Sequence, residues 1–296
     1  MTVLTTQGLS KSYGKLKALD GLNLTIEEGQ IYGILGPNGS GKTTTLGILL
    51  NILKPSQGSF EWFDGQYKTQ ARRHIGAILE TPNFYPYMNA SQNLDIVRRT
   101  KGLPKQDFDD ILEQVNLSER KKSPFRSYSL GMKQRLAIAA TLIGDPKVLI
   151  FDEPTNGLDP QGIAEVRDIL LRVSRSGRAV IMASHILDEV EKICSHVAII
   201  KKGKLLATGP IGAILQDNTI IEVAAADMGK LTDDLRKLSY VTDIETRNNW
   251  IECVIPADVS TASFSSEMYM LGNVPTRLVA RKRRLEEEFL EITKQS

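Results

Sequence analysis

Hydrophobic residues in the first two thirds of the chain fall into two patterns that alternate along the sequence. Some form continuous apolar runs, typical of strands buried on both faces, and others recur every three or four residues, typical of helices. The runs predict strands at 31–35, 75–79, 147–153 and 179–183. The helical spacing predicts helices at 44–53, 131–143, 163–173 and 187–193. Strands that alternate with helices indicate an α/β domain with a mainly parallel sheet.

Other segments of this region do not fit a parallel sheet. Apolar and polar residues alternate over 19–26, which suits a half-exposed antiparallel strand. Extended structure is also predicted at 3–12 and 59–63 and in a hairpin over 197–207. Residues 91–122 show helical segments at 93–101 and 108–115 and no strand signal. We therefore expect an antiparallel β subdomain, and a helical subdomain at about 88–128.

The pattern changes near residue 217. Short strands are predicted at 220–224, 241–245 and 250–254, and helices at 231–238, 265–271 and 285–293. We interpret 1–216 as one domain and 217–296 as a separate, smaller α+β domain. The basic run Arg281–Arg284 stands just before three glutamates, 286–288, and we favour a solvated helix face for it.

A glycine-rich segment lies between the predicted strand 31–35 and the predicted helix 44–53. It reads Gly36 to Thr43 and fits G-x-x-x-x-G-K-[ST], a phosphate-binding loop in the strand–loop–helix context that the motif needs. Its glycines let successive backbone N–H groups point at an anion, next to the positive end of the following helix. Lys42 can reach the β- and γ-phosphates, and the Thr43 hydroxyl can bind Mg²⁺. The nucleotide is expected to contact Gly36, Pro37, Asn38, Gly39, Ser40, Gly41, Lys42, Thr43 and Thr44.

Two acidic residues, Asp152 and Glu153, end the apolar run that begins at Lys147. Beside a phosphate loop, the first acid suits the Mg²⁺ shell and the second suits the attacking water. Tyr13, after the first predicted strand, could stack on a nucleotide base or could simply close the strand end. At this point an ATPase, a GTPase and a small-molecule kinase all remain open.

Composition narrows the setting. The net charge of +2 over 296 residues gives no general argument for nucleic-acid binding. Cys194 and Cys253 fit no metal spacing and suggest reduced thiols. The first six residues lack the features of a signal peptide, and no apolar run approaches the ~20 residues of a membrane span. If the protein acts at a membrane, we expect another chain to supply the membrane part.

With these segments assembled, residues 3–215 resemble the ATP-binding subunit of an ABC transporter. Gly36–Thr43 matches the Walker A loop, and Val148–Asp152 with Glu153 matches Walker B and the catalytic glutamate. Further matches are the D-loop at Asn156–Asp159, the switch histidine at His185, the adenine-stacking aromatic at Tyr13 and the signature at Ser129–Arg135. GTPases and small-molecule kinases do not carry that signature.

The sequence departs from the common family pattern at two places. The signature usually begins LSGGQ, whereas here Tyr128–Met132 reads YSLGM, which keeps only Ser129 and Gly131. Glu80 stands where the family has the glutamine of its Q-loop. Both variants, together with Phe84–Pro86, are similar to bacterial exporters of the bacitracin and lantibiotic type.

The resemblance implies an ABC ATPase core that binds ATP and Mg²⁺ between two such subunits, as a homodimer or heterodimer. Lys42, Glu153 and His185 would be catalytic, whereas His74 and His196 have no such support and are expected to be structural. The metal ligands would be Thr43, Asp152 and Glu80. Ser129 and Gly131 would act in trans on the nucleotide of the partner subunit.

The same resemblance implies a place on the cytoplasmic face of the cell membrane, beside a separate transmembrane permease, and no nucleic-acid partner. Export of an antibiotic, a peptide or a lipid stays open. An alternative is a soluble ABC ATPase that acts on ribosomes or DNA, although one cassette with a short insert disfavours it. Residues 80–88 hold two prolines and three aromatics, which either contact the permease or pack under the helical subdomain.

Overall fold

The computed structural model describes residues 1–79, 83–215 and 218–294. The chain forms two compact units, Met1–Pro210 and Ile211–Lys294, and each is described by itself.

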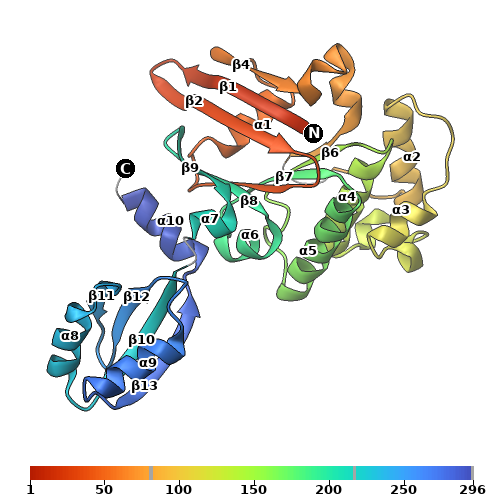
Figure 1. Ribbon diagram of the computed structural model, residues 1–296. Coiled ribbons are helices and arrows are strands. Elements are labelled where there is room, and N and C mark those ends of the chain that lie inside the picture. Colours follow the sequence, from red (N-terminus) through yellow and green to blue (C-terminus); the bar gives the residue numbers. More distant parts are fainter. Residues whose placement is uncertain (80–82, 216–217, 295–296) are drawn as a thin grey trace. The chain divides into compact units, whose positions relative to one another are not determined.

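A six-stranded sheet forms the centre of the first unit, with strand order β5-β6-β7-β3-β8-β9 (Figure 1). The first five of these strands run parallel, and β9 is antiparallel to β8. The strands are β3 Ile31–Leu35, β5 Ile75–Ile78, β6 Val148–Asp152, β7 Ala179–Ser184, β8 His196–Lys201 and β9 Lys204–Pro210. Every residue of β3, β6 and β7 is buried, which explains why each reads as a continuous apolar run.

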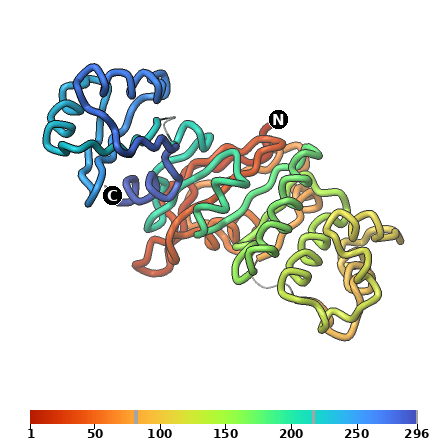
Figure 2. The backbone as a smooth tube through the Cα atoms, turned by 90° about the horizontal axis from the view of Figure 1, so that it is seen from below, coloured from red at the N-terminus to blue at the C-terminus, as the bar shows by residue number. Residues whose placement is uncertain are grey.

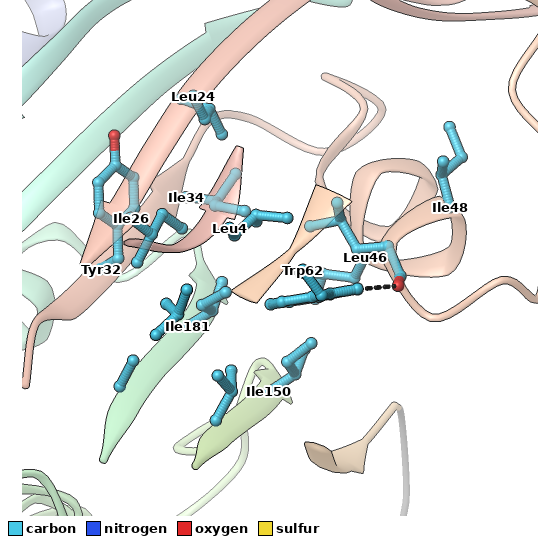
Figure 3. Close-up of a cluster of buried hydrophobic side chains, with 14 of the residues drawn as sticks. Leu4, Leu24, Ile26, Tyr32, Ile34, Leu46, Ile48, Trp62, Ile150 and Ile181 are labelled. Atoms are coloured by element: carbon cyan, nitrogen blue, oxygen red, sulfur yellow. Dashed lines mark hydrogen bonds between the residues drawn. The ribbon is translucent and has the colours of Figure 1, made fainter. Parts of the chain in front are cut away.

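A second, antiparallel sheet lies on the other side of helix α1 (Lys42–Leu49), which contacts strands of both sheets. Its strands are β1 Thr2–Tyr13, β2 Leu16–Glu27 and β4 Gln57–Trp62, in the order β2-β1-β4. One hydrophobic core joins the two sheets and α1 (Figure 3). Trp62 packs within it, and its indole N–H donates to the Leu49 carbonyl at 3.1 Å, so this large side chain is buried without losing a hydrogen bond.

The remaining helices of this unit lie against the other face of the large sheet or to one side of it (Figures 1 and 2). Against the sheet pack α4 Leu130–Leu142, α5 Pro160–Arg175 and α6 Leu187–Ile193. To the side stand α2 Ala90–Thr100 and α3 Asp109–Gln114, with short 3₁₀ turns at Ser118–Arg120 and Phe125–Ser127. Two more 3₁₀ segments, Phe63–Gly65 and Lys68–His74, lead from β4 to β5.

The second unit is a four-stranded antiparallel sheet with helices packed on it. Strand order is β11-β12-β10-β13, and from β10 to β13 the chain order is strand, helix, two strands, helix, strand. The elements are α7 Ile211–Ile214, β10 Thr219–Ala225, α8 Met228–Lys237, β11 Thr242–Thr246, β12 Ile251–Ile255, α9 Thr261–Met270, β13 Pro275–Lys282 and α10 Leu285–Lys294. Its core joins one face of the sheet to α8 and α9.

The basic run at Arg281–Arg284 differs from the predicted helix face. Arg281 and Lys282 end strand β13, and α10 begins only at Leu285. Arg281 binds Glu222 and Glu287, so its charge is balanced by carboxylates from neighbouring elements. The prediction was wrong because the first two residues of the run end a strand, and the partner Glu222, on β10, cannot be read from the local sequence.

Candidate nucleotide-binding site

A cavity of about 680 Å³ opens in the first unit, beside the ends of strands β3 and β6. Carboxyl ends of parallel strands meet at one edge of a sheet, which is where ligands of such folds bind. The cavity is lined by Tyr13, Leu16, Ala18, Asn38, Gly39, Ser40, Gly41, Lys42, Thr43, Thr44, Leu130, Gln134, Asp152, Glu153 and Asn156. Segments that are far apart in the sequence therefore converge on the predicted phosphate loop.

The loop is held in shape by its own lysine. The Lys42 ammonium is buried and donates to the Gly36 carbonyl at 2.8 Å. Gly36 and Pro37 do not line the cavity, whereas the other seven predicted nucleotide contacts do. Gly41 has φ of +113°, and a Cβ there would lie 2.5 Å from the Ala18 carbonyl oxygen. Only glycine fits at this position, because it has no Cβ.

Thr43 and Asp152 form a pair of oxygen donors at the cavity. The Thr43 hydroxyl donates to the Asp152 carboxylate at 2.8 Å. Mg²⁺ prefers oxygen ligands and takes few of them from protein in phosphate sites. Across the described parts of the chain no cluster of three or more His, Cys, Asp or Glu side chains could hold a metal. A hydroxyl with one carboxylate therefore fits Mg²⁺ that is also bound by nucleotide phosphates, and does not fit a metal held by protein alone.

Glu153 lies between Lys42 and His185. Its carboxylate is 2.8 Å from the His185 Nδ1 and 3.8 Å from the Lys42 ammonium. Its backbone has φ of +50°, a conformation that non-glycine residues rarely adopt, and its N–H donates to the Ala183 carbonyl at 2.9 Å. Strained residues of this kind often occur at functional sites. The geometry thus aims the carboxylate at the cavity from the strand end.

Tyr13 stands at the rim and is 47% exposed. The Lys11 ammonium lies 5.2 Å from the centre of its ring. Leu16 pairs with Tyr13 across the β1–β2 hairpin and is also exposed. We did not single out Leu16 from the sequence. The sequence feature that could have indicated Leu16 is its apolar side chain directly after the Gly14-Lys15 turn, where a polar residue is usual.

Comparison with known proteins decides the family. A family model described as ABC transporter matches residues 19–156. The bacitracin transport ATP-binding protein BcrA of Enterococcus faecalis is 33% identical over 98% of this chain and 96% of its own length. This chain belongs to the ABC transporter ATP-binding proteins.

Other relatives agree with this assignment. The lantibiotic transport ATP-binding protein SrtF of Streptococcus pyogenes is 40% identical, over 69% of this chain and 89% of its own. The structure of cbiO1 from Clostridium perfringens, part of the ABC transporter complex cbiONQ, has a TM-score of 0.66 at 31% identity, covering 72% of this chain and 90% of that one. The predicted ABC ATPase fold, ATPase activity and transporter role are confirmed. The alternative of a soluble ATPase on ribosomes or DNA is not supported.

Ser129 and Gly131, of the segment that matches the ABC signature, do not line the cavity of the phosphate loop in their own chain. Ser129 caps helix α4, accepting the Met132 N–H at 3.2 Å. Ser129 and Gly131 line a separate hollow together with the D-loop residues Gly157 and Asp159. Leu130, which stands where the common signature has glycine, lines both this hollow and the nucleotide cavity. Leu130 and Gln134 in the cavity were not predicted, since their role depends on how α4 is placed.

The loop before α2 is partly described, because the predicted metal ligand Glu80 lies outside the described residues. From Asn83 onward the loop is organised by Asn93, which is 1% exposed. Its amide accepts the Tyr85 N–H at 2.8 Å and donates to the carbonyls of Tyr85, Met88 and Asn89. Phe84 packs on Phe125, with ring centres 5.2 Å apart.

Two aromatics of this loop are not packed inside. Tyr85 is 48% exposed and Tyr87 is 67% exposed. Phe84 is therefore packed against the helical subdomain, as one of the two alternatives for 80–88 expects, whereas contact between the exposed tyrosines and the permease stays a prediction. None of the helices that the structure describes has the length and apolar character to span a membrane.

The two other histidines make structural contacts. His74 packs against Tyr67, with ring centres 3.9 Å apart, and His196 stacks on Tyr32. Neither lines the nucleotide cavity.

Proposed function

We propose that this chain hydrolyses MgATP in the cavity described above and drives export of an antibiotic, a peptide or a lipid through a separate membrane permease. The observation that carries the proposal is the convergence of Lys42, Thr43, Asp152 and Glu153 on one cavity, with His185 on the glutamate. Export and the class of cargo are supported by relatives that are named for bacitracin and lantibiotic transport.

The contacts of Lys42, Thr43 and Asp152 suit particular roles in binding MgATP. Lys42 would leave the Gly36 carbonyl and bind the β- and γ-phosphates, since an ammonium so close to the loop is already positioned. Thr43 and Asp152 would hold Mg²⁺, with Glu80 as a third candidate in the Q-loop position. The ion would neutralise charge on the phosphates and on the group in transfer. Backbone N–H groups of Gly39 to Thr44 would bind the remaining phosphate oxygens.

Glu153 would orient and polarise the attacking water. A carboxylate 2.8 Å from the His185 Nδ1 is held in one rotamer, which lowers the entropy lost when water and phosphate align. His185, whose side chain is 43% exposed, would also contact the γ-phosphate once ATP is present.

The cavity would be closed by a second subunit. Ser129 and Gly131 line a different hollow from Lys42 in the same chain, so they are available to a nucleotide held by another copy. The Ser129 hydroxyl and the N-terminus of α4 would provide donors for that γ-phosphate. We propose a dimer of ATPase subunits on this basis, with either an identical or a related partner.

Contact with the permease would involve Tyr85 and Tyr87, on the cytoplasmic face of the membrane. These tyrosines are presented by a loop that Asn93 holds in place, and exposed aromatics on a rigid loop favour a protein interface. Tyr side chains bring a large contact area at low entropic cost. Movement of the loop with the nucleotide would then reach the membrane chain.

Replacement of Glu153 by glutamine tests the site. We expect Glu153→Gln to reduce steady-state phosphate release at least about a hundredfold, to leave ATP affinity within a few-fold, and to favour an ATP-dependent dimer in analytical ultracentrifugation. Glu119→Gln, on the exposed surface of the helical subdomain, is the matched control and should behave as the unaltered protein. Unchanged turnover in Glu153→Gln would contradict the assignment.

A further inference from the structure

The turn between β8 and β9, Lys202-Gly203, contacts the phosphate loop through the backbone of Ser40. The Gly203 N–H donates to the Ser40 carbonyl at 2.8 Å, and the Gly203 carbonyl accepts the Asp20 N–H at 2.8 Å. Gly203 therefore bridges two parts of the site, the loop on one side and strand β2 on the other. None of the sequence motifs contains this residue.

Close packing restricts this position to glycine. Gly203 has φ of +80°, and a Cβ on it would lie 2.9 Å from the carbonyl carbon and oxygen of Ala18 and 3.1 Å from the Leu19 Cα. Those are backbone atoms of β2, which cannot turn aside as a side chain can. The same Ala18 carbonyl lies 2.5 Å from the place of a Cβ on Gly41. The Ala18 peptide is thus enclosed between two glycines, one in the turn and one in the loop.

This arrangement sets the position of the loop backbone. Ser40 is 2% exposed and stands two residues before Lys42, so a shift of its carbonyl moves the peptides that would face the phosphates. An anion site made of backbone N–H groups depends on their directions. A shift of these N–H groups therefore weakens their contacts with the phosphates and lowers the affinity for ATP.

We propose that Gly203 is a positioning residue for ATP binding: it holds the Ser40 carbonyl at the distance from β2 at which the loop N–H groups converge on the phosphates. Gly203 does not line the cavity and acts only through Ser40. The proposal rests on the assignment of Gly36 to Thr44 as the nucleotide site.

The test compares two glycines with the same backbone requirement and different surroundings. Gly177 has φ of +90° and nothing within 4 Å of a built Cβ, so Gly177→Ala introduces backbone strain without crowding. In the full-length protein we expect Gly203→Ala to raise the KM and Kd for ATP about tenfold or more above those of Gly177→Ala. Saturating ATP should restore kcat to within about twofold, because loss of binding that is equal in the ground and transition states changes KM alone.

Asparagine variants at the same two positions separate the steric effect of a Cβ from the strain of a positive φ. Asparagine tolerates a positive φ better than alanine but still carries a Cβ, so Gly203→Asn should keep the raised KM while Gly177→Asn does not. These variants also replace Gly203→Ala if that protein does not fold. A Gly203→Asn protein with the KM of Gly177→Asn would overturn the proposal, as would a fall in kcat that saturating ATP does not restore.

A third variant tests the assumption beneath the proposal. Lys42→Ala should abolish ATP binding if Gly36 to Thr44 is the nucleotide site. If Lys42→Ala binds ATP normally, the site assignment itself fails, whatever the Gly203 variants do. If Lys42→Ala loses binding and both Gly203 variants retain it, only the role of Gly203 fails.

Discussion

A side chain at the rim of the cavity can change the affinity for the nucleotide without changing the rate of hydrolysis. Tyr13 is such a side chain. One face of the Tyr13 ring is approached by the Lys11 ammonium, and about half of the side chain is open to solvent. A cation above one face leaves the other for a base. Tyr13 would therefore contribute to binding in the ground state and the transition state alike, unlike Glu153.

The consequence can be measured with Tyr13→Ala. Stacking of a base on an aromatic side chain contributes about 1–3 kcal/mol, so the KM for ATP should rise roughly fivefold to a hundredfold while kcat at saturating ATP stays the same. Tyr13→Phe should keep the wild-type KM, because the ring is retained. Tyr269→Ala, which removes an exposed tyrosine of the second unit outside the cavity, is the control. A Tyr13→Ala protein with the KM of this control would show that the ring only closes the strand end.

At the scale of elements, hydrogen bonds from α2 hold the loop before it in one conformation. Asn93 is the third residue after the start of α2 at Ala90, and its single amide binds backbone groups of three loop residues. Asn89, which caps the helix, forms a reciprocal pair with Gln92, the arrangement known as a capping box. The start of the helix and the loop shape are therefore fixed together.

Asn93→Ala should loosen the loop while leaving the fold intact. Backbone groups that lose a buried partner cost about 1–3 kcal/mol, so we expect the free energy of unfolding to fall by about 2 kcal/mol. Chymotrypsin should also cut faster after Tyr87, because a protease needs a flexible segment. Gln106→Ala, at an exposed position between α2 and α3, serves as the reference. Equal digestion rates for the two variants would contradict the anchoring role of Asn93.

Elements buried on both faces were predictable from the sequence, and so was the core of the site. Strands β3, β6 and β7 read as apolar runs because no face of them meets water, and residues at their carboxyl ends had to come together. Strand β13 was not predicted, because its apolar residues Leu278, Val279 and Ala280 are consecutive and do not alternate with polar ones, and because its arginines find their partners on other elements. The exposure of Tyr85 and Tyr87 likewise depends on a hydrogen-bonded loop that composition does not encode.

At the scale of the whole molecule, the second unit contains a connected group of charged side chains around Glu222 and Arg281. Glu222, on the central strand β10, accepts hydrogen bonds from Arg277 and Arg281. Arg281 also pairs with Glu287 at 2.9 Å, which ties the sheet to α10. The Arg277 guanidinium in particular lowers the pKa of Glu222, and the Lys237 ammonium lowers the pKa of Asp234.

These shifts make the stability of the second unit depend on pH. A carboxylate whose pKa is lower in the folded state stabilises the fold above its unfolded pKa, about 4.3 for Glu and 3.9 for Asp, and this contribution is lost as pH falls through the folded value. We therefore expect the unfolding midpoint of this unit to fall as pH decreases from about 5 toward 3. Glu222→Gln should flatten that decrease, since one of the titrating groups is removed.

The chain offers a probe that reports on the second unit alone. It has two tryptophans, Trp62 in the first unit and Trp250 beside the Arg277 guanidinium, 4.8 Å from its ring. In a Trp62→Phe background, fluorescence follows Trp250 only, and thermal unfolding between pH 7 and 3 gives the midpoint of the second unit in the full-length protein. Glu286→Gln, at an exposed position on α10, should keep the pH dependence of the background. If Glu222→Gln also keeps it, the Arg277–Glu222 pair does not link the second unit's stability to pH, and its charges serve only to balance one another on the sheet.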